Sequence, residues 1–423
     1  MKADADALII GGGPAGASAA IGLAIAGWRV VLVEQHAYPR QKVCGECLAA
    51  GCFPLLDDIG VGQEVRRLCG AELKRVGWMD AAGTSIADMP QCATATDAYG
   101  RALGRDVFDS LLLERARAAG VRILQPARVR KVAGTCGAFR CDIADSFGED
   151  AGGDMSEPTL TVAASLVIDA HGSWESGPRL EVPGRPTDPA RAPGNAADLL
   201  AFKATFRGSR LPPGFLPVVA IPGGYGGMVV ANEGRTTVAL CLRRDTLRSV
   251  RSQHRGVAAG IAVERHLRES CPGVQNALCD GEREGGWLAV GPLRPGIRLS
   301  ETPGIYRVGN ACGETHPLVG EGMHMALQSS RMLVRSLIRH ADRTSETRRL
   351  SAAHHAYANA WRTSFVPRMR FASCYAEIAM RPALALPVGR LLRRWPTVLT
   401  TAARFAGKAR APLAALNFAE EPA

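Results

Sequence analysis

A glycine-rich turn close to the N-terminus is the feature that most restricts how this chain folds. The apolar run Ala7–Ile10 leads directly into Gly11–Gly16, with the sequence Gly-Gly-Gly-Pro-Ala-Gly, and an alanine-rich segment continues to Ala26. A second apolar run, Arg29–Val33, ends at Glu34, which lies 18 residues after Gly16. This order predicts a Rossmann-type dinucleotide-binding unit of α/β class, which consists of a buried strand, a tight turn, a helix, a second strand and a terminal acid.

Each residue of the turn has an expected role at the cofactor. Gly11 permits the tight turn, Gly13 lets a pyrophosphate approach the backbone, and Gly16 lets the helix pack closely on the strand. Pro14 and Ala15 begin a helix whose free N–H groups point at the phosphates. After the second strand, Glu34 is expected to bind a ribose hydroxyl and Gln35 to contact the cofactor as well.

The composition excludes several other classes of protein. A chain of 423 residues is long enough for two or three lobes around a large core. Its net charge is +11, yet only six residues are Lys and 5% are aromatic. Nucleic-acid binding would require a basic stripe with interleaved aromatic residues, and the sequence has none. No signal peptide or apolar span of about 18 residues is apparent. Twelve irregularly spaced cysteines favour reduced thiols and a cytoplasmic location.

Later segments favour FAD over NAD as the bound dinucleotide. Residues 164–172 form an apolar run that ends in Asp-Ala-His-Gly, and residues 305–313 form another that ends in Gly-Asn-Ala-Cys-Gly. The second continues through Glu314–Gly322 into an expected helix, Met323–Ile338, and a further helix is expected to open at Arg105-Asp106-Val107-Phe108-Asp109. These three motifs and the glycine turn, spread over residues 5–335, resemble the FAD-dependent family of para-hydroxybenzoate hydroxylase-like monooxygenases and geranylgeranyl reductase-like flavoproteins.

The resemblance implies further cofactor contacts. The family's matching Arg lies near FAD, which assigns Arg105, and Asn310 stands where the family has an acid that bonds the ribityl and pyrophosphate region. Asn310 can still donate and accept hydrogen bonds there. The segment Gly320-Glu321-Gly322-Met323 is expected to set a helix N-terminus against the flavin pyrimidine ring, where it would stabilise negative charge.

A cysteine-containing loop follows the second strand. The Lys42-Val43-Cys44-Gly45 sequence looks like the loop of geranylgeranyl reductases, in which the Cys lines the substrate side of the flavin. Lys42 and Gly45 are therefore assigned to the cofactor, and Cys44 to both the cofactor and catalysis. Cys44 and Cys47 also form a C-x-x-C pattern, so a redox disulfide is one interpretation and a buried, small apolar Cys47 is the other. Cys52 is expected to be buried in the same way.

A β-rich substrate lobe is expected to include the strands Lys203–Phe206, Met228–Val230 and Thr237–Leu240. Residues 222–230 align with the Pro-x-x-Tyr-x-Trp-x-Phe-Pro segment of geranylgeranyl reductases. Tyr225 matches, but the Trp position is Gly227 and the Phe-Pro pair is Val-Val, which argues against an isoprenoid substrate. Tyr225, Gly227 and Glu46 are assigned to substrate binding. The sequence also lacks the Trp-x-Trp-x-Ile-Pro motif, which argues against a halogenase.

His316 and Pro317 complete the predicted catalytic set, with Pro317 helping to close the oxygen-reacting face. His316 has two interpretations, a hydrogen-bond donor to substrate or flavin and a structural hydrogen-bonding residue. His171 and His324 are expected to be structural. No metal site is expected.

The expected fold class is α/β, with a discontinuous, glutathione-reductase-like FAD-binding domain, a β-sheet substrate domain and a C-terminal helical segment. The predicted FAD-binding domain comprises residues 1–75, 100–178 and 286–340, the substrate domain 76–99 and 179–285, and the helical region 341–423. Residues 381–410 interleave Arg with apolar residues. This segment is expected either to cap the FAD-binding domain or to make a weak contact with a membrane surface.

The favoured function is a flavin monooxygenase of secondary metabolism acting on an apolar or aromatic small molecule. No second G-x-G-x-x-G occurs at a strand–helix junction, so NAD(P)H is expected to bind transiently, or electrons to come from a donor protein. The alternative is a geranylgeranyl reductase-like reductase or dehydrogenase of a lipid-like C=C bond. A non-catalytic flavin-binding protein is the third hypothesis.

Overall fold

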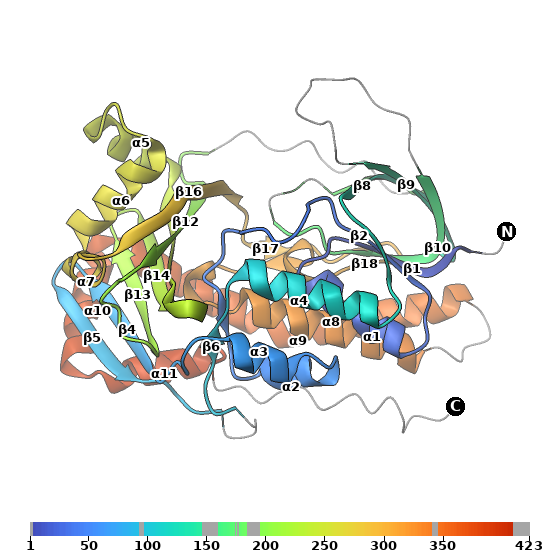
Figure 1. Cartoon of the computed structure of the whole chain (residues 1–423), viewed down its shortest axis with the longest axis horizontal. Helices are drawn as coiled ribbons and strands as arrows, with labels where there is room; N and C mark the ends of the chain where they lie inside the picture. Colours follow the sequence, from blue (N-terminus) through green and yellow to red (C-terminus); the bar gives the residue numbers. More distant parts are fainter. Residues whose placement is uncertain are drawn as a thin grey trace.

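The computed structural model of the chain describes residues 3–92, 97–145, 160–173, 175, 177–183, 195–340 and 346–408. Residues 146–157, whose Gly-, Asp- and Ser-rich sequence predicts an exposed loop, lie outside these ranges. Two large β-sheets with associated helices make up most of the described part of the molecule (Figure 1). Helix α9 (Glu346–Met380) contacts helices that pack against one sheet and strands of the other, so it ties the two halves together.

The first sheet contains the dinucleotide-binding pattern. In the described residues it has eight strands in the order β11-β8-β9-β10-β1-β2-β7, with β18 also paired to β10. Strand β1 runs parallel to β2 and β10 and places Ile10 opposite both Val33 and Asp169. The segments that follow these three strands therefore meet at one edge of the sheet. The strands are β1 (Ala5–Ile10), β2 (Val30–Val33), β7 (Arg122–Leu124), β8 (Ala127–Thr135), β9 (Ala138–Asp145), β10 (Leu160–Asp169), β11 (Arg179–Glu181) and β18 (Ile305–Arg307).

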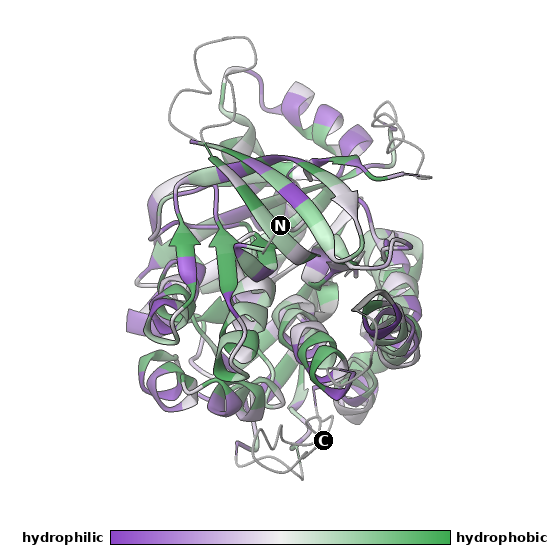
Figure 2. Ribbon diagram, turned by 90° about the vertical axis from the view of Figure 1, so that its right-hand side faces the viewer, coloured by the Kyte–Doolittle hydropathy of each residue, from purple (hydrophilic) through white to green (hydrophobic). Residues whose placement is uncertain are grey.

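A layer of helices belongs to this first sheet. Helix α1 (Pro14–Ile25) packs between α4 (Arg105–Ala118) and α8 (Gly322–Arg339), and α8 packs on α9. Figure 2, turned by 90° from Figure 1, views the helical layer nearly from the helix ends, and both hydrophobic and hydrophilic residues are visible in it. Gly27, with φ +82°, ends α1 in the left-handed conformation that glycine favours. The helices expected after Gly13, at Arg105 and over 323–338 are confirmed. Two short helices, α2 (Cys52–Asp58) and α3 (Gly62–Leu68), join the layer.

The second sheet has seven strands within the described ranges, and all neighbours are antiparallel except β13 and β4. It includes the three strands expected for a β-rich lobe. In spatial order they are β16 (Glu282–Leu293), β12 (Leu199–Arg207), β15 (Thr236–Arg243), β14 (Gly224–Val230), β13 (Phe215–Ile221), β4 (Arg75–Asp80) and β5 (Gly83–Asp88). An apolar core joins this sheet to α5 (Arg244–Gln253), α6 (Ala259–Ser270) and α7 (Pro272–Ala277).

The C-terminal part of the chain is mainly helical up to residue 408, as expected. Helices α10 (Pro382–Arg394) and α11 (Thr397–Phe405) pack on β4 and β5. An ion pair fastens α10 to the sheet, with Arg393 Nη1 3.1 Å from Asp80 Oδ1, and Trp78 Nε1 donates to the same carboxylate. Among the helices that the structure describes, none is long and apolar enough to span a membrane.

Short elements border the space between the sheets. Two-residue strands pair as β3 (Cys47–Leu48) with β6 (Arg101–Ala102) and as β17 (Gly296–Ile297) with β19 (Gly313–Glu314). Three 3₁₀ helices are η1 (Asn232–Gly234), η2 (Gly309–Ala311) and η3 (Pro317–Val319). The architecture confirms the expected α/β class with a second β-sheet and a C-terminal helical segment.

Candidate active site

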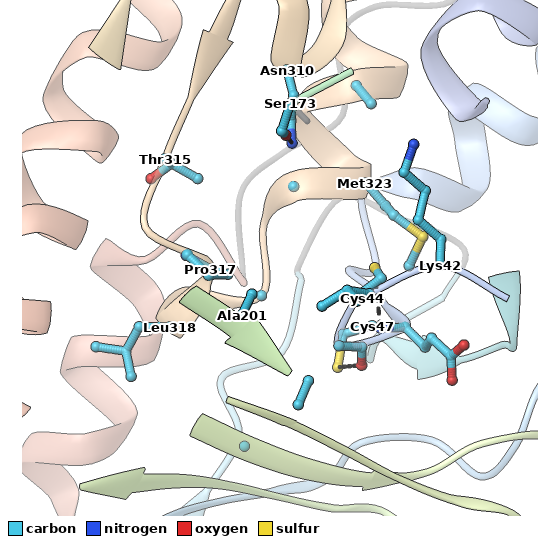
Figure 3. A pocket seen from close by; sticks show the side chains of 18 of the residues that line it. Lys42, Cys44, Cys47, Ser173, Ala201, Asn310, Thr315, Pro317, Leu318 and Met323 are labelled. Atoms are coloured by element: carbon cyan, nitrogen blue, oxygen red, sulfur yellow. Dashed lines mark hydrogen bonds between the residues drawn. The ribbon is translucent and has the colours of Figure 1, made fainter. Parts of the chain in front are cut away.

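One continuous pocket lies between the two sheets. Its polar end is formed by the turn after β1 and the residues that follow β2, β10 and β18. Its other end is formed by β12, β13, β14 and β15 of the second sheet and by α11. Figure 3 shows Cys44 and Cys47 on one side of the pocket, Asn310 and Ser173 at its upper end, and Pro317 and Leu318 opposite the cysteines.

The glycine turn has the geometry that its sequence predicts. Gly11 has φ +102°, and a Cβ placed there would lie 2.5 Å from the Ala170 carbonyl oxygen. A Cβ on Gly16 would lie 1.9 Å from the Gly11 oxygen, so close packing of α1 on the strand requires glycine there. Gly13 is different, because the nearest atom to its Cβ position is Arg105 Nη2 at 3.7 Å. Gly11, Gly13, Pro14 and Ala15 line the pocket, whereas Gly16 lies behind them.

Glu34 lies at the end of β2, buried and beside this turn. Its Oε2 accepts a hydrogen bond of 2.7 Å from the Gly12 backbone N–H, and its Oε1 accepts one of 2.9 Å from His36 N–H. The carboxylate lines the pocket with a fixed orientation, which suits a group that accepts from a ribose hydroxyl. Gln35 is not among the lining residues, and its side-chain amide contacts the His36 ring instead.

Basic side chains gather near this end of the pocket. Lys42 and Arg40 both lie in its wall and approach Glu175, with N–O distances of 3.9 and 3.6 Å. Burial opposes ionisation of Glu175, but the His36 hydrogen bond and the charges of Lys42 and Arg40 outweigh it and lower its pKa to about 2. Burial lowers the pKa of Lys42, although Glu175 opposes that shift. The group offers positive charge to an anionic ligand.

Arg105 is held in the pocket wall by a bidentate ion pair at the start of α4. Its Nε and Nη2 donate to the two carboxylate oxygens of Asp109, at 2.7 and 2.6 Å. Burial opposes the charge on the guanidinium, yet the Asp109 carboxylate outweighs it and raises the pKa of Arg105. The planar fork is therefore rigid and fully charged next to Gly13.

The loop of Cys44 and Cys47 carries two free thiols in the structure. Cys44 is half-buried in the pocket wall, and its sulfur accepts from the Glu46 backbone N–H at 3.4 Å. Cys47 is buried and donates to the Gly45 carbonyl oxygen, and burial raises the pKa of its thiol to about 12. The expected burial of Cys47 and Cys52 is confirmed.

Glu46, predicted to touch substrate, lines the pocket, but its carboxylate is already occupied. The side chain is 3% exposed, and its Oε1 forms an ion pair with the equally buried Lys203 of β12. Its Oε2 accepts from the Thr237 hydroxyl of β15, and Oε1 also accepts from Arg105 N–H at 3.1 Å. Glu46 has φ +57°, a conformation that non-glycine residues rarely adopt. The carboxylate thus joins the cysteine loop to the second sheet.

A polar cluster lies at the carboxyl end of β18. Asn310 Nδ2 donates to Ser173 Oγ at 2.7 Å, and both residues line the pocket. Glu314 lines it as well, 2% exposed, with its Oε2 accepting from Arg294 N–H at 3.2 Å. Burial raises the pKa of Glu314, against the hydrogen bonds that favour its charged form. Glu314 and Ser173 were not predicted as site residues, although Glu314 stands within the motif that contains Asn310.

Helix α8 begins at the pocket, as the late glycine motif predicted. Gly320, Gly322 and Met323 line the pocket, and no atom lies within 4 Å of a Cβ built on Gly322. Glu321 is turned inward, where His324 Nδ1 lies 2.9 Å from its Oε2 and Lys408 Nζ 3.4 Å from its Oε1. Its side chain therefore fastens the helix start rather than lining the pocket.

Tyr225 and His316 form a pair near Pro317. The Tyr225 hydroxyl lies 2.9 Å from His316 Nδ1, and Tyr225, Gly227 and Pro317 line the pocket. Burial raises the pKa of Tyr225 well above its usual value and lowers that of His316. The pair therefore combines a protonated tyrosine with a neutral histidine, in which one ring nitrogen donates and the other accepts. His316 itself is not among the lining residues.

The two histidines expected to be structural are both paired with carboxylates. His171 Nδ1 lies 2.5 Å from Asp169 Oδ1 at the end of β10. Burial lowers the pKa of His171, but the Asp169 carboxylate outweighs burial, so the pKa is raised. His324 is buried against Glu321 in α8.

The pocket away from the glycine turn is mostly apolar. Side chains of the second sheet, of the residue after β5, of η3 and of the C-terminal helical region form it: Val76, Met89, Leu216, Val218, Met228, Leu240, Leu293, Leu318, Tyr375, Leu399, Ala402, Ala403 and Ala406. The contribution of α11 was not predicted, because helical periodicity does not reveal which buried surface a helix will face. Lys408, just after α11, also lines the pocket and donates to the Gly320 carbonyl oxygen at 3.1 Å.

The residues present fit a dinucleotide such as FAD. Gly13, Gly45 and Gly322 all line the pocket, and the protein leaves at least 3.7 Å of space at each Cβ position, so a ligand can approach the backbone there. The N-termini of α1 and α8 offer N–H groups, and Arg105 and Lys42 offer positive charge. Within the described residues, no cluster of His, Cys, Asp or Glu is arranged to hold a metal ion.

Comparison with known proteins agrees with this geometry. Residues 4–237 match the model of the FAD binding domain family. The chain is 26% identical over 358 residues to the flavin-dependent halogenase armH3 of Armillaria mellea, which covers 76% of this chain and 65% of the relative. It is 30% identical over 127 residues to a menaquinone reductase of Mycobacterium tuberculosis, and this match covers 29% of each of the two proteins. Matches to the first three curated relatives, all halogenases by name, span 25 to 65% of their lengths.

Solved structures share the fold. A geranylgeranyl bacteriochlorophyll reductase-like protein of Thermoplasma acidophilum superposes with a TM-score of 0.67 at 18% identity, covering 94% of this chain and 91% of that one. The flavin-dependent brominase Bmp2 superposes with a TM-score of 0.68 at 14% identity, covering 96% and 93%. The halogenases among the relatives were not expected, because the sequence lacks the Trp-x-Trp-x-Ile-Pro motif.

Proposed function

This chain belongs to the FAD binding domain family, and from that premise we propose that it is a monooxygenase acting on an apolar or aromatic small molecule. NAD(P)H binding transiently would supply the electrons, since the chain has no second G-x-G-x-x-G unit at a strand–helix junction. Per turnover, substrate, O₂, NAD(P)H and a proton would yield hydroxylated substrate, NAD(P)⁺ and water. We place this reaction in the cytoplasm and in secondary metabolism.

A single observation carries the proposal: the apolar part of the pocket continues directly into the cradle that fits FAD. Leu216, Val218 and Met228 of the second sheet line it, and the same pocket includes Cys44, Pro317 and the glycine turn. Apolar lining with few polar groups favours a ligand whose binding depends on hydrophobic burial.

FAD, when bound, would supply the redox chemistry, because its reduced form reacts with O₂ or transfers hydride. Residues of the chain would bind and orient the reactants. Arg105, Lys42 and the two helix N-termini would hold the phosphates and favour negative charge on the flavin. The Tyr225–His316 pair would orient a polar group of the substrate, and Pro317 and Leu318 would help exclude water.

Two other reactions have specific support. The Lys42–Gly45 loop and the partial match to a menaquinone reductase support reduction of a lipid-like C=C bond by hydride transfer from the flavin. The halogenase relatives support halide oxidation at the same flavin, followed by transfer of the halogen to an aromatic substrate. The absence of the Trp-x-Trp-x-Ile-Pro motif weighs against the latter.

The reaction is tested by reducing the FAD-loaded protein without oxygen, then admitting air in a stopped-flow with candidate aromatic ligands. We expect a transient absorbance spectrum distinct from both reduced and oxidised flavin, and oxygen incorporated into product. Product formation without oxygen would instead identify a reductase. A halogenated product that requires chloride or bromide would identify a halogenase. A flavin that no nicotinamide or donor protein reduces would favour a non-catalytic flavin-binding protein.

A further inference from the structure

Exposed apolar side chains are concentrated on α10 and α11. Among the described residues, eight large hydrophobic side chains are exposed, and five of them lie on these two helices or between them. They are Leu384, Leu391, Trp395, Val398 and Phe405, and four of them recur at intervals of seven residues. Phe405 and Trp395 are 69% and 55% exposed. We call these five residues the apolar face.

The segment that carries the apolar face has only basic charges. Between Glu377 and Glu420 the sequence has seven basic residues and no acidic one. Arg393 is turned inward to Asp80, but Arg390, Arg394 and Arg404 are exposed. Within the part of the chain that the structure describes, no acidic side chain pairs with these three. Clustered arginines beside exposed Leu, Trp, Val and Phe are the composition of a helix that lies in a lipid–water interface.

The inner sides of the same helices are packed against the body of the protein. Ala385, Gly389 and Leu392 are buried against the second sheet, and Leu399 and Ala403 of α11 are buried and line the pocket. Figure 1 shows both helices beside β4 and β5, the edge of the second sheet. The apolar face is therefore exposed while α10 and α11 stay packed on the body of the protein, so neither helix needs to unfold.

We propose that the apolar face, with Arg390, Arg394 and Arg404, docks this protein onto an anionic lipid bilayer. Leu, Trp, Val and Phe side chains would enter the interfacial region, and the arginines would contact lipid phosphates. A second copy of the chain fits less well, because a twofold interface would bring the same basic patch of both copies together, with no acidic group in the segment to offset it.

Docking would also place one wall of the pocket next to lipid. Helix α11 has Val398 and Phe405 on its exposed side and Leu399 and Ala403 on its pocket side. A lipid-soluble substrate could then enter beside α11. This consequence rests on the proposed function, whereas vesicle binding does not.

Vesicle flotation of the FAD-loaded full chain tests the docking. We expect binding to phosphatidylcholine vesicles that contain phosphatidylglycerol, weak binding to phosphatidylcholine alone, and weaker binding as NaCl rises from about 0.05 to about 0.5 M. The variant Leu391→Ser/Trp395→Ser/Val398→Ser should bind about tenfold or more weakly, since three apolar side chains no longer enter the interface. Charge reversal in Arg390→Glu/Arg394→Glu/Arg404→Glu should abolish the preference for anionic lipid.

The matched control is Ile25→Ser/Ile297→Ser, which removes exposed apolar side chains elsewhere and should bind like the unmodified protein. Melting temperature and FAD content, measured for every variant, exclude unfolding as the cause of lost binding. Absent binding to anionic vesicles, or equal binding by the serine variant, would overturn the proposal. A dimer in light scattering that the serine variant dissociates, without vesicle binding, would assign the face to self-association instead.

Discussion

At the scale of single residues, two glycines of one turn have opposite surroundings. A Cβ on Gly16 would overlap the Gly11 oxygen, whereas a Cβ on Gly13 would meet only Arg105 Nη2 at 3.7 Å. Gly13 also has φ −70°, which any residue can adopt. The protein fold thus requires glycine at position 16, whereas at position 13 only a bound ligand would require it.

This contrast predicts different defects for two variants. Gly13→Val should fold with its melting transition almost unchanged in the FAD-free protein, yet lose bound flavin, because the added methyl groups occupy the space of the pyrophosphate. Gly16→Val should fail to fold. Flavin absorbance after purification and a thermal melt measure both effects. A yellow Gly13→Val protein would contradict the assignment of the turn to the phosphates.

Cys44 is the other residue whose role can be isolated. Cys44→Ala should lower kcat on the order of tenfold while FAD stays bound, because it shortens a side chain in the wall of the pocket that we propose for the substrate. Steady-state turnover and flavin content are the measurements, and the exposed Cys279→Ala is the control. Turnover equal to that of the control would show that Cys44 only packs.

At the scale of elements, the start of α8 depends on a buried charge cluster. Glu321 is surrounded by Lys408, His324 and Arg368, the last with Nη1 at 3.6 Å from Oε2. Burial disfavours ionisation of Glu321, but these positive groups outweigh it and lower its pKa from 4.5 to about 2. The ionised carboxylate consequently connects α8 with α9 and with the residues after α11.

The depressed pKa predicts a loss of stability in acid. Because the folded-state pKa lies below that of the unfolded chain, Glu321 contributes its full stabilisation above about pH 4.5 and loses it as pH falls toward 2. Urea unfolding between pH 6 and about 3 should show this loss. Glu321→Gln should be less stable at pH 6 and respond less steeply to acid. Parallel pH curves for the two proteins would contradict this role.

At the scale of the whole molecule, the ion pair of Glu46 and Lys203 joins the two halves across the pocket. Glu46 lies in the loop after β2 of the first sheet, and Lys203 in β12 of the second. Both side chains are almost fully buried, so neither charge can be solvated if its partner is removed. The positive φ of Glu46 also makes the loop conformation depend on these contacts.

Removal of one charge of the Glu46–Lys203 pair should therefore destabilise the folded protein. We expect Glu46→Gln to lower the free energy of unfolding by about 3–5 kcal/mol, and Glu46→Gln/Lys203→Met to recover part of that loss. The exposed pair Arg210–Asp280 provides the control, and Asp280→Asn should cost less than about 1 kcal/mol. Urea titrations of the FAD-free proteins measure all three. Equal costs for Glu46→Gln and Asp280→Asn would rule out a joining role.

The FAD-binding half could be predicted from local sequence. Strand, glycine turn, helix and terminal acid are consecutive, and each depends on neighbours within a few residues: Gly11 on its own positive φ, Glu34 on its place at the end of β2. The fold class, the helices at Arg105 and Met323 and three strands of the second sheet followed from the same kind of pattern. The predicted site residues mostly lie together because parallel strands end at one edge of a sheet.

Contacts between distant segments depended on the tertiary structure. Glu46 was assigned to substrate, but its carboxylate is occupied by Lys203 and Thr237, which follow it by 157 and 191 residues. Glu314 reaches the pocket from β19, which pairs with β17, and α11 becomes a pocket wall through its packing on β4 and β5. Side-chain burial and pairing depend on such long-range contacts, and a local pattern carries no information about which distant partner will be present.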